Sequence, residues 1–228
     1  MNSDTLYFLI IVMFFVSLIV QGVVNSRFNK LSKVPVSTGM TGYQAAERIL
    51  HSAGVTDVKI ELTQGHLSDH YDPSSKTLRL SPAVAQESSI AAVSVAAHEA
   101  GHALQHAQNY GPLMLRSSSA FMANFGSRLS WPIFLIGLLM GSSLLVNAGI
   151  ALYVVIVLFT LITLPVEFNA SSRALSLMTD HGVIREGEKA DVYSMLSAAA
   201  MTYVVSAVSA ILQLLRLIAI AKGGKRRD

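Results

Sequence analysis

Three histidines and a glutamate stand close together in the stretch VSVAAHEAGHALQHAQ, which begins at Val93. His98 and His102 are four residues apart, so on an α-helix they differ by only ~40° in direction and ~6 Å in rise, and both imidazoles can reach one metal ion. Glu99 lies ~100° further around the helix, where its carboxylate can reach a water on that ion without becoming a ligand. This HExxH spacing predicts a zinc site that activates water for attack on a peptide carbonyl, with Glu99 as the general base.

His106 continues the spacing of four but is not expected to be a third ligand. It lies ~12 Å along the helix axis from His98, too far for one ion unless the helix breaks. No glycine or proline interrupts residues 102–106, and the position where a metzincin would place its third histidine is Gln108. A surface or supporting role is therefore predicted for His106.

The residues around the motif indicate a buried helix. Alanine, valine, glycine and leucine surround the histidines, and an exposed face would not be built from them. Gly101 costs a helix ~1 kcal/mol relative to alanine. Such a cost is easier to understand if another backbone packs closely against Gly101.

The third ligand should be a carboxylate from elsewhere in the chain, and Glu167 is the best candidate because it directly follows a long apolar run. If residues 129–166 form a membrane hairpin, Glu167 returns to the side of His98. The alternative is a glutamate that only marks a membrane boundary. Glu186, Glu188 and Glu87 are weaker competitors for the ligand role.

The composition points to a membrane protein. Only 14% of the residues are charged and 52% are hydrophobic, whereas charged residues make up ~25% of an ordinary globular domain. Uncharged runs at residues 5–24, 129–166 and 192–215 are each long enough to cross a bilayer, and the middle one is too long for a single crossing. We expect it to turn at Val146–Gly149, which gives about four transmembrane helices.

Basic residues set the expected orientation. Arg27, Lys30 and Lys33 follow the first apolar run, so the positive-inside rule places the following segment in the cytoplasm. The sequence predicts a multi-pass protein of the plasma membrane with its site on the cytoplasmic side. The net charge is +3 and the basic residues flank apolar runs, which favours contact with the lipid bilayer over nucleic acid. With no cysteine present, any metal must be held by histidine, carboxylate or water.

Regular elements are expected between the apolar runs. Thr41 and Gln44 are spaced as a capping box for a short helix that ends at Gly54. Strand patterns follow at residues 57–62 and in a hairpin at 67–81, and the HExxH helix should run from about residue 88 to 109.

The hairpin contains further potential ligands, Asp69, His70 and Asp72. Neighbours on a strand point to opposite faces, so these three residues would not converge on a metal. The hairpin is expected to edge the active site and pair with the substrate backbone, or else to be a stable hairpin with a polar turn and no further role. The remaining histidines, His51, His66 and His181, are expected at the surface.

The fold class predicted is mainly α: an integral membrane protein with about four transmembrane helices and a small α+β zincin-like catalytic domain. The predicted segments are an anchor (1–24), a catalytic region (25–128), a transmembrane hairpin (129–166), a glutamate-ligand helix and loop (167–191), and a last transmembrane helix with a basic tail (192–228).

Three motifs together carry a resemblance to a known family: GHLSDHYDPSSKTLRLS, IAAVSVAAHEAGHALQ and LPVEFNASSRAL. The chain resembles the YugP-like membrane-bound neutral zinc metallopeptidases and, more distantly, the HtpX and CAAX-processing membrane peptidases. The resemblance implies a gluzincin-type site with Zn²⁺ held by His98, His102 and Glu167, and with Glu99 as catalytic base. In the wider group an aspartate four residues after the ligand glutamate supports a zinc histidine, and here that position is Ser171. Asn169 and Arg173 lie nearby and offer other support.

The sequence therefore favours a membrane zinc endopeptidase whose substrates are peptides or proteins, including membrane-protein segments. The alternative is a non-catalytic membrane scaffold with a structural zinc site. Such a site would need a fourth protein ligand, whereas this sequence offers three ligands and a base. A transporter is disfavoured because the longest apolar run contains no ionisable group.

Overall fold

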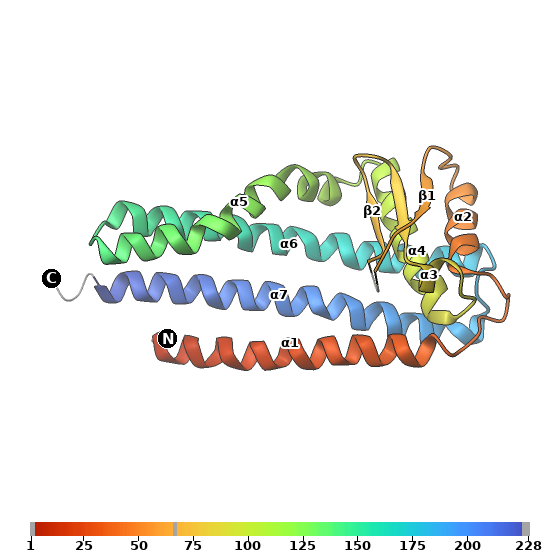
Figure 1. Ribbon diagram of the computed structural model, residues 1–228, viewed down its shortest axis with the longest axis horizontal. Coiled ribbons are helices and arrows are strands. Elements are labelled where there is room, and N and C mark those ends of the chain that lie inside the picture. Colours follow the sequence, from red (N-terminus) through yellow and green to blue (C-terminus); the bar gives the residue numbers. More distant parts are fainter. Residues whose placement is uncertain (1–2, 66–67, 225–228) are drawn as a thin grey trace. The chain divides into compact units, whose positions relative to one another are not determined.

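The computed structural model describes residues 3–65 and 68–224, and it shows a mainly helical chain with one small sheet (Figure 1). The elements follow in the order α1 (Ser3–Leu31), α2 (Gly42–Ser52), β1 (Lys59–Leu62), β2 (His70–Asp72), β3 (Thr77–Leu80), α3 (Pro82–Ala85), α4 (Ile90–Ala107), α5 (Gly111–Leu139), α6 (Ser143–Asp180), the 3₁₀ turn η1 (Glu186–Glu188) and α7 (Lys189–Gly224).

Contacts divide the chain into two compact units. The first consists of Met1–Ile19, Met114–Pro165 and Thr202–Asp228, and the second of Val20–Leu113 and Val166–Met201. Helices α1, α5, α6 and α7 each contribute residues to both units. The segment boundaries expected from the sequence stay predictions.

The second unit contains the three-stranded sheet, whose order is β1-β3-β2. β1 runs parallel to β3, and β2 runs antiparallel to β3 with Tyr71 opposite Leu78. β2 is therefore an edge strand. The predicted hairpin is confirmed over the part of residues 67–81 that the structure describes, and the side chain of Asp72 closes its turn by accepting hydrogen bonds from Ser74 N (2.9 Å) and Ser75 Oγ (2.7 Å).

The caps of α2 and α4 agree closely with the sequence patterns. Thr41 and Gln44 form the predicted capping box at the start of α2, and Gly54 follows the helix with a φ of +71°. α4 begins one residue after Ser89, whose side chain accepts a hydrogen bond from Ala92 N. These local signals fix where α4 starts, and the spacing of the functional residues along the helix then sets the face on which each one lies.

The core of the second unit surrounds α4. Small side chains make this helix narrow enough to be covered on several sides by α2, α3 and the sheet (Figure 1). Its fully buried apolar positions are Ile90, Ala91, Val93, Ala96, Ala97, Ala100 and Ala103. The expectation of a buried HExxH helix is confirmed.

In the first unit, α5 and α6 form a helical hairpin, but its turn is not at Val146–Gly149 as the sequence suggested. The chain reverses at residues 140–142, where Gly141 has a φ of +63° and Ser142 N donates to Gly137 O at 2.8 Å. Gly149 lies inside α6 instead, and a Cβ there would come within 2.7 Å of Phe134 Cβ on α5. The glycine that looked like a turn residue serves the close packing of the two helices.

Glu167 does not begin a new helix, which is a second correction. α6 continues through Pro165 to Asp180. A proline inside a helix removes one backbone hydrogen bond, yet the helix continues because Val166, Ala170, Ala174 and Met178 beyond the proline are all fully buried.

Three helical segments among the described residues are long and apolar enough to cross a membrane: Asp4–Leu31, Ser143–Asp180 and Glu186–Gly223. The fourth expected crossing corresponds to the second half of α5, which is not among them. The structure thus supports a mainly helical protein with three candidate membrane-spanning helices.

Candidate metal centre

Two helices bring His98, His102 and Glu167 together. The histidines project from successive turns of α4, with ring centroids 4.8 Å apart and an angle of 85° between the ring planes. From α6, Glu167 Oε2 lies 3.3 Å from His98 Nε2 and 3.6 Å from His102 Nε2. The candidate ligand atoms of the three residues all lie within 4.8 Å of one another.

These donors suit a zinc ion in both chemistry and spacing. Imidazole nitrogens bind zinc at ~2.0–2.1 Å and carboxylate oxygens at ~2.0–2.2 Å, so two donors on a tetrahedron are separated by about 3.4 Å. The two distances to Glu167 Oε2 bracket that value. Glu167 is only 1% exposed, and a buried carboxylate requires a cation or hydrogen-bond donors around it.

Gly101 explains how α6 comes close enough to α4 for Glu167 to reach the histidines. A Cβ on Gly101 would lie 2.8 Å from the backbone oxygen of Ala170, a distance that real Cβ atoms do not tolerate. The close backbone approach expected at this glycine is confirmed. Because Ala170 is three residues after Glu167, the same contact sets the position of the carboxylate.

A buried amide supports His102. His102 Nδ1–H donates to Gln105 Oε1 at 3.0 Å, and Gln105 Nε2 donates to Val166 O at 2.8 Å and to Asn169 Oδ1 at 3.0 Å. Because Gln105 Nε2 donates to these two acceptors, its Oε1 faces the imidazole and accepts the Nδ1 proton. His102 Nε2 then keeps its lone pair for a metal. Gln105 is fully buried. The sequence reasoning missed it, although a lone glutamine three residues after His102 in an apolar helix is the signal that would have found it.

Ser171 supports the other histidine. Its hydroxyl lies 3.2 Å from His98 Nδ1, so a serine takes the place where the wider group of peptidases has an aspartate. Arg173 acts one step further out, because its Nε donates to Asn169 Oδ1 at 2.7 Å. The nearby Asn169 and Arg173 thus reach His102 through Gln105.

Glu99 leaves α4 in a different direction and faces the edge strand β2. Its Oε2 accepts a hydrogen bond from Tyr71 N at 3.0 Å. Burial raises the pKa of the Glu99 carboxyl above its usual 4.5, so this carboxylate is a better proton acceptor than an exposed glutamate. The backbone of β2 therefore holds one oxygen of the candidate base.

Two of the three competing carboxylates have other partners. Glu188 accepts hydrogen bonds from Ser37 N (2.7 Å) and Arg185 N (2.7 Å), and Glu186 pairs with Lys189 at 2.7 Å. Within residues 3–65 and 68–224, the group of His98, His102 and Glu167 is the one arranged to hold a metal ion. Glu186, Glu188 and Glu87 are not part of it.

The acidic residues of the hairpin also serve local structure. Asp69 Oδ1 accepts a hydrogen bond from Ser81 N at 2.7 Å, and Asp72 binds the turn and Arg79. His70 Nδ1 lies 2.8 Å from Ser68 O. These three residues do not gather into a second metal group in the described part of the chain.

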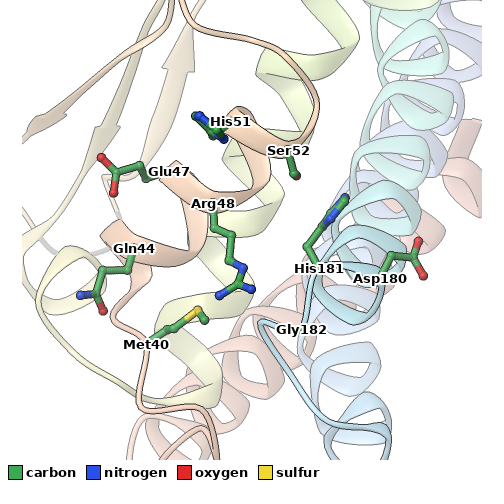
Figure 2. Close-up of a pocket in the computed structure, with 9 residues that line it drawn as sticks. All are labelled: Met40, Gln44, Glu47, Arg48, His51, Ser52, Asp180, His181 and Gly182. Atoms are coloured by element: carbon green, nitrogen blue, oxygen red, sulfur yellow. The ribbon is translucent and has the colours of Figure 1, made fainter.

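Two other histidines line an open groove in the second unit, between α2 and the C-terminal end of α6 (Figure 2). His51 is exposed and His181 is partly buried, and neither belongs to the metal-ligating group found among the described residues. His66 lies outside the residues that the structure describes.

Comparison with known proteins places the chain in a family. The sequence model of the family described as "Putative neutral zinc metallopeptidase" matches residues 6–222, and the chain belongs to this family. The family description and the set of donor atoms therefore both indicate zinc as the metal.

A curated relative covers nearly the same length. The protein described as "Putative membrane protease YugP" of Bacillus subtilis (strain 168) is 48% identical over 202 residues, which are 89% of this chain and 90% of the relative. Its description and the three apolar helices both indicate association with a membrane. No solved structure matches the chain.

Proposed function

We propose that this protein is a membrane-embedded zinc metalloendopeptidase of the gluzincin type, with His98, His102 and Glu167 as zinc ligands and Glu99 as the general base. The observation that carries the proposal is the spacing of the three donor atoms, which fits one tetrahedral ion. Glu99 is partly buried beside them and does not belong to the ligand group. Three protein ligands are the number used by catalytic zinc sites, whereas structural sites use four.

Each residue has a distinct task in this reaction. Zinc held by these three ligands would act as a Lewis acid, which would lower the pKa of a bound water and polarise the peptide carbonyl. Glu99 accepts the proton of the attacking water and then delivers it to the nitrogen of the departing amine. Gln105 and Ser171 hold His102 and His98 in the tautomer that leaves each Nε2 free for the ion.

The substrate is proposed to be a peptide that pairs with the edge strand β2. The strand order leaves one side of β2 without a neighbouring strand, and the outer N–H of Tyr71 lies at Glu99. Because the Tyr71 N–H is taken by Glu99, an extended peptide would pair with the other outward backbone groups of this edge and have its backbone next to the base, whatever its side chains. Peptides and membrane-protein segments that are unfolded near the bilayer are therefore the proposed substrates.

The proposed topology has four crossings of the plasma membrane, with the catalytic site on the cytoplasmic side. The second half of α5 would be the fourth crossing, because it is apolar and forms a hairpin with α6. Arg27, Lys30 and Lys33 after the first apolar run support the cytoplasmic placement.

The decisive experiment compares the purified wild type with Glu99→Gln in zinc content and in cleavage of an unstructured reporter peptide. General bases contribute about 10²–10⁴-fold to rate, so Glu99→Gln should lose at least a hundredfold in kcat and keep its zinc. Glu47→Gln, an exposed glutamate on α2, is the matched control and should cleave normally. A wild type that binds zinc but cleaves nothing would favour the structural zinc scaffold instead.

A further inference from the structure

Tyr71 contacts α4 with its backbone and with its side chain at once. Its backbone N–H donates to Glu99 Oε2 at 3.0 Å, and its phenol oxygen lies 2.8 Å from His106 Nδ1. Glu99 and His106 are seven residues apart, which is about two helical turns and a difference of only ~20° in direction. One tyrosine thus bridges two positions on the same face of α4, and β2, the strand that carries it, contacts this helix.

The phenol–imidazole bond is well suited to a fixed geometry. Burial, with added repulsion from the carboxylates of Asp57 and Asp72, raises the pKa of Tyr71 to about 12. The phenol therefore keeps its proton at neutral pH and can donate it to His106 Nδ1. The two rings are tilted by 53° with centroids 5.8 Å apart, so they meet through this bond and are not stacked.

The position of β2 depends on this bond more than it would in a larger sheet. β2 has three residues and pairs with β3 on one side. Edge strands this short are held weakly by their ladder, and the other side of β2 is held to α4 through the two hydrogen bonds of Tyr71. If the phenol lost its partner, the strand could shift and take the Tyr71 amide away from Glu99.

We propose that His106 and the Tyr71 phenol are positioning residues, which lock β2 against α4 so that the Tyr71 amide aims the Glu99 carboxylate at the attacking water. This inference rests on the proposed function. It assigns His106 a role separate from the metal, because the histidine acts on the base through Tyr71 and is not a member of the metal-ligating group. The competing interpretation is a tyrosine–histidine contact that only stabilises the hairpin.

The test measures kcat, KM, zinc content and thermal midpoint for four variants of the full chain in detergent. Tyr71→Phe and His106→Leu each remove the phenol–imidazole hydrogen bond, and the double variant removes that same single bond. His106→Asn keeps a hydrogen-bond acceptor near the position of Nδ1. A misplacement of reacting groups by 1 Å can cost ~100-fold. We expect Tyr71→Phe and His106→Leu each to lower kcat about 10- to 100-fold, with KM changed less than threefold and zinc retained.

Two further outcomes separate positioning from simple stability. The double variant should be no slower than the worse single variant, because both changes remove one interaction, and His106→Asn should recover most of the rate. Tyr43→Phe and His51→Leu are matched controls on α2 and should behave as the wild type. An unchanged kcat in His106→Leu would overturn the inference. A loss of activity that is explained by released zinc, or by a lower thermal midpoint, and that His106→Asn does not rescue would overturn it as well.

Failure of the inference and failure of the proposed function give different results. If the wild type cleaves the reporter peptide, Glu99→Gln does not and His106→Leu matches the wild type, then only the role of His106 is wrong. If the wild type and Glu99→Gln are equally inactive with zinc bound, then the proposed peptidase itself is wrong.

Discussion

Gly101→Ala is a substitution for which helix propensity alone and the structure predict opposite results. In an isolated helix the change should stabilise by ~1 kcal/mol, because alanine is the better helix former. In this structure the new Cβ would lie 2.8 Å from Ala170 O, whereas ordinary contact begins at 3.4 Å, a shortfall of about 0.6 Å. The Cβ is fixed in place by the backbone of α4 and the oxygen belongs to the backbone of α6, so α4 and α6 must move apart.

The consequence for zinc follows from where Glu167 stands on α6. Ligand distances in a metal site are tolerated within ~0.2 Å, and a shift of about 0.6 Å at Ala170, three residues away, exceeds that. We expect Gly101→Ala to weaken zinc binding roughly 10- to 100-fold, the range found when the supports of a ligand are disturbed. The overpacking cost of ~1–3 kcal/mol should also cancel or exceed the gain in helix propensity.

The assay is competition for zinc with a chromophoric chelator, together with the thermal midpoint of the metal-free protein. Gly22→Ala is the matched control, because a Cβ at this helical glycine in α1 would meet no atom within 4 Å. It should leave zinc binding unchanged. If Gly101→Ala bound zinc within threefold of the wild type and melted at a higher temperature, the close approach of the two helices would not be what positions Glu167.

Two other predictions can be checked on the same protein. Gln105→Leu removes the amide that accepts the His102 Nδ1 proton and should weaken zinc binding about 10-fold or more by the same competition assay, while Gln86→Leu, an exposed glutamine at the C-terminal end of α3, should weaken it less than threefold. Topology can be mapped with single cysteines because the chain has none: a label at Ser143 should react from outside intact cells and one at Ser52 only after permeabilisation. The reverse pattern at both positions would refute the cytoplasmic site.

The features that the sequence predicted well are those fixed within one helix. The directions of His98, Glu99 and His102 follow from their spacing alone, because α-helix geometry is the same in every protein. The capping box of α2 was equally predictable, since its hydrogen bonds join residues only three apart. Glu167 was selected over the other glutamates from its place directly after a long apolar run, and the resemblance to the peptidase family implied the same ligand.

The features that the sequence did not predict depend on contacts between elements. Gly141 and Gly149 are both plausible turn residues, and only the packing of Phe134 against Gly149 decides that the chain turns at the former. The amide of Tyr71 is 28 residues from Glu99, so its role needs the sheet to be placed on α4 first. A pattern that is local along the chain carries no information about such pairs.

The HExxH spacing also has a consequence for how the rest of the chain must be built. Adjacent residues on a helix point ~100° apart, so a base that directly follows a ligand cannot face the same neighbour as the ligand. Here His98, Gly101, His102 and Gln105 face α6, whereas Glu99 and His106 face β2. Because the two faces contact different elements, substitutions on α6 should change the zinc affinity. Substitutions on β2 should change the turnover number while zinc binding stays the same. The motif thereby separates the tasks of holding the metal and aiming the base, and each can be weakened without the other.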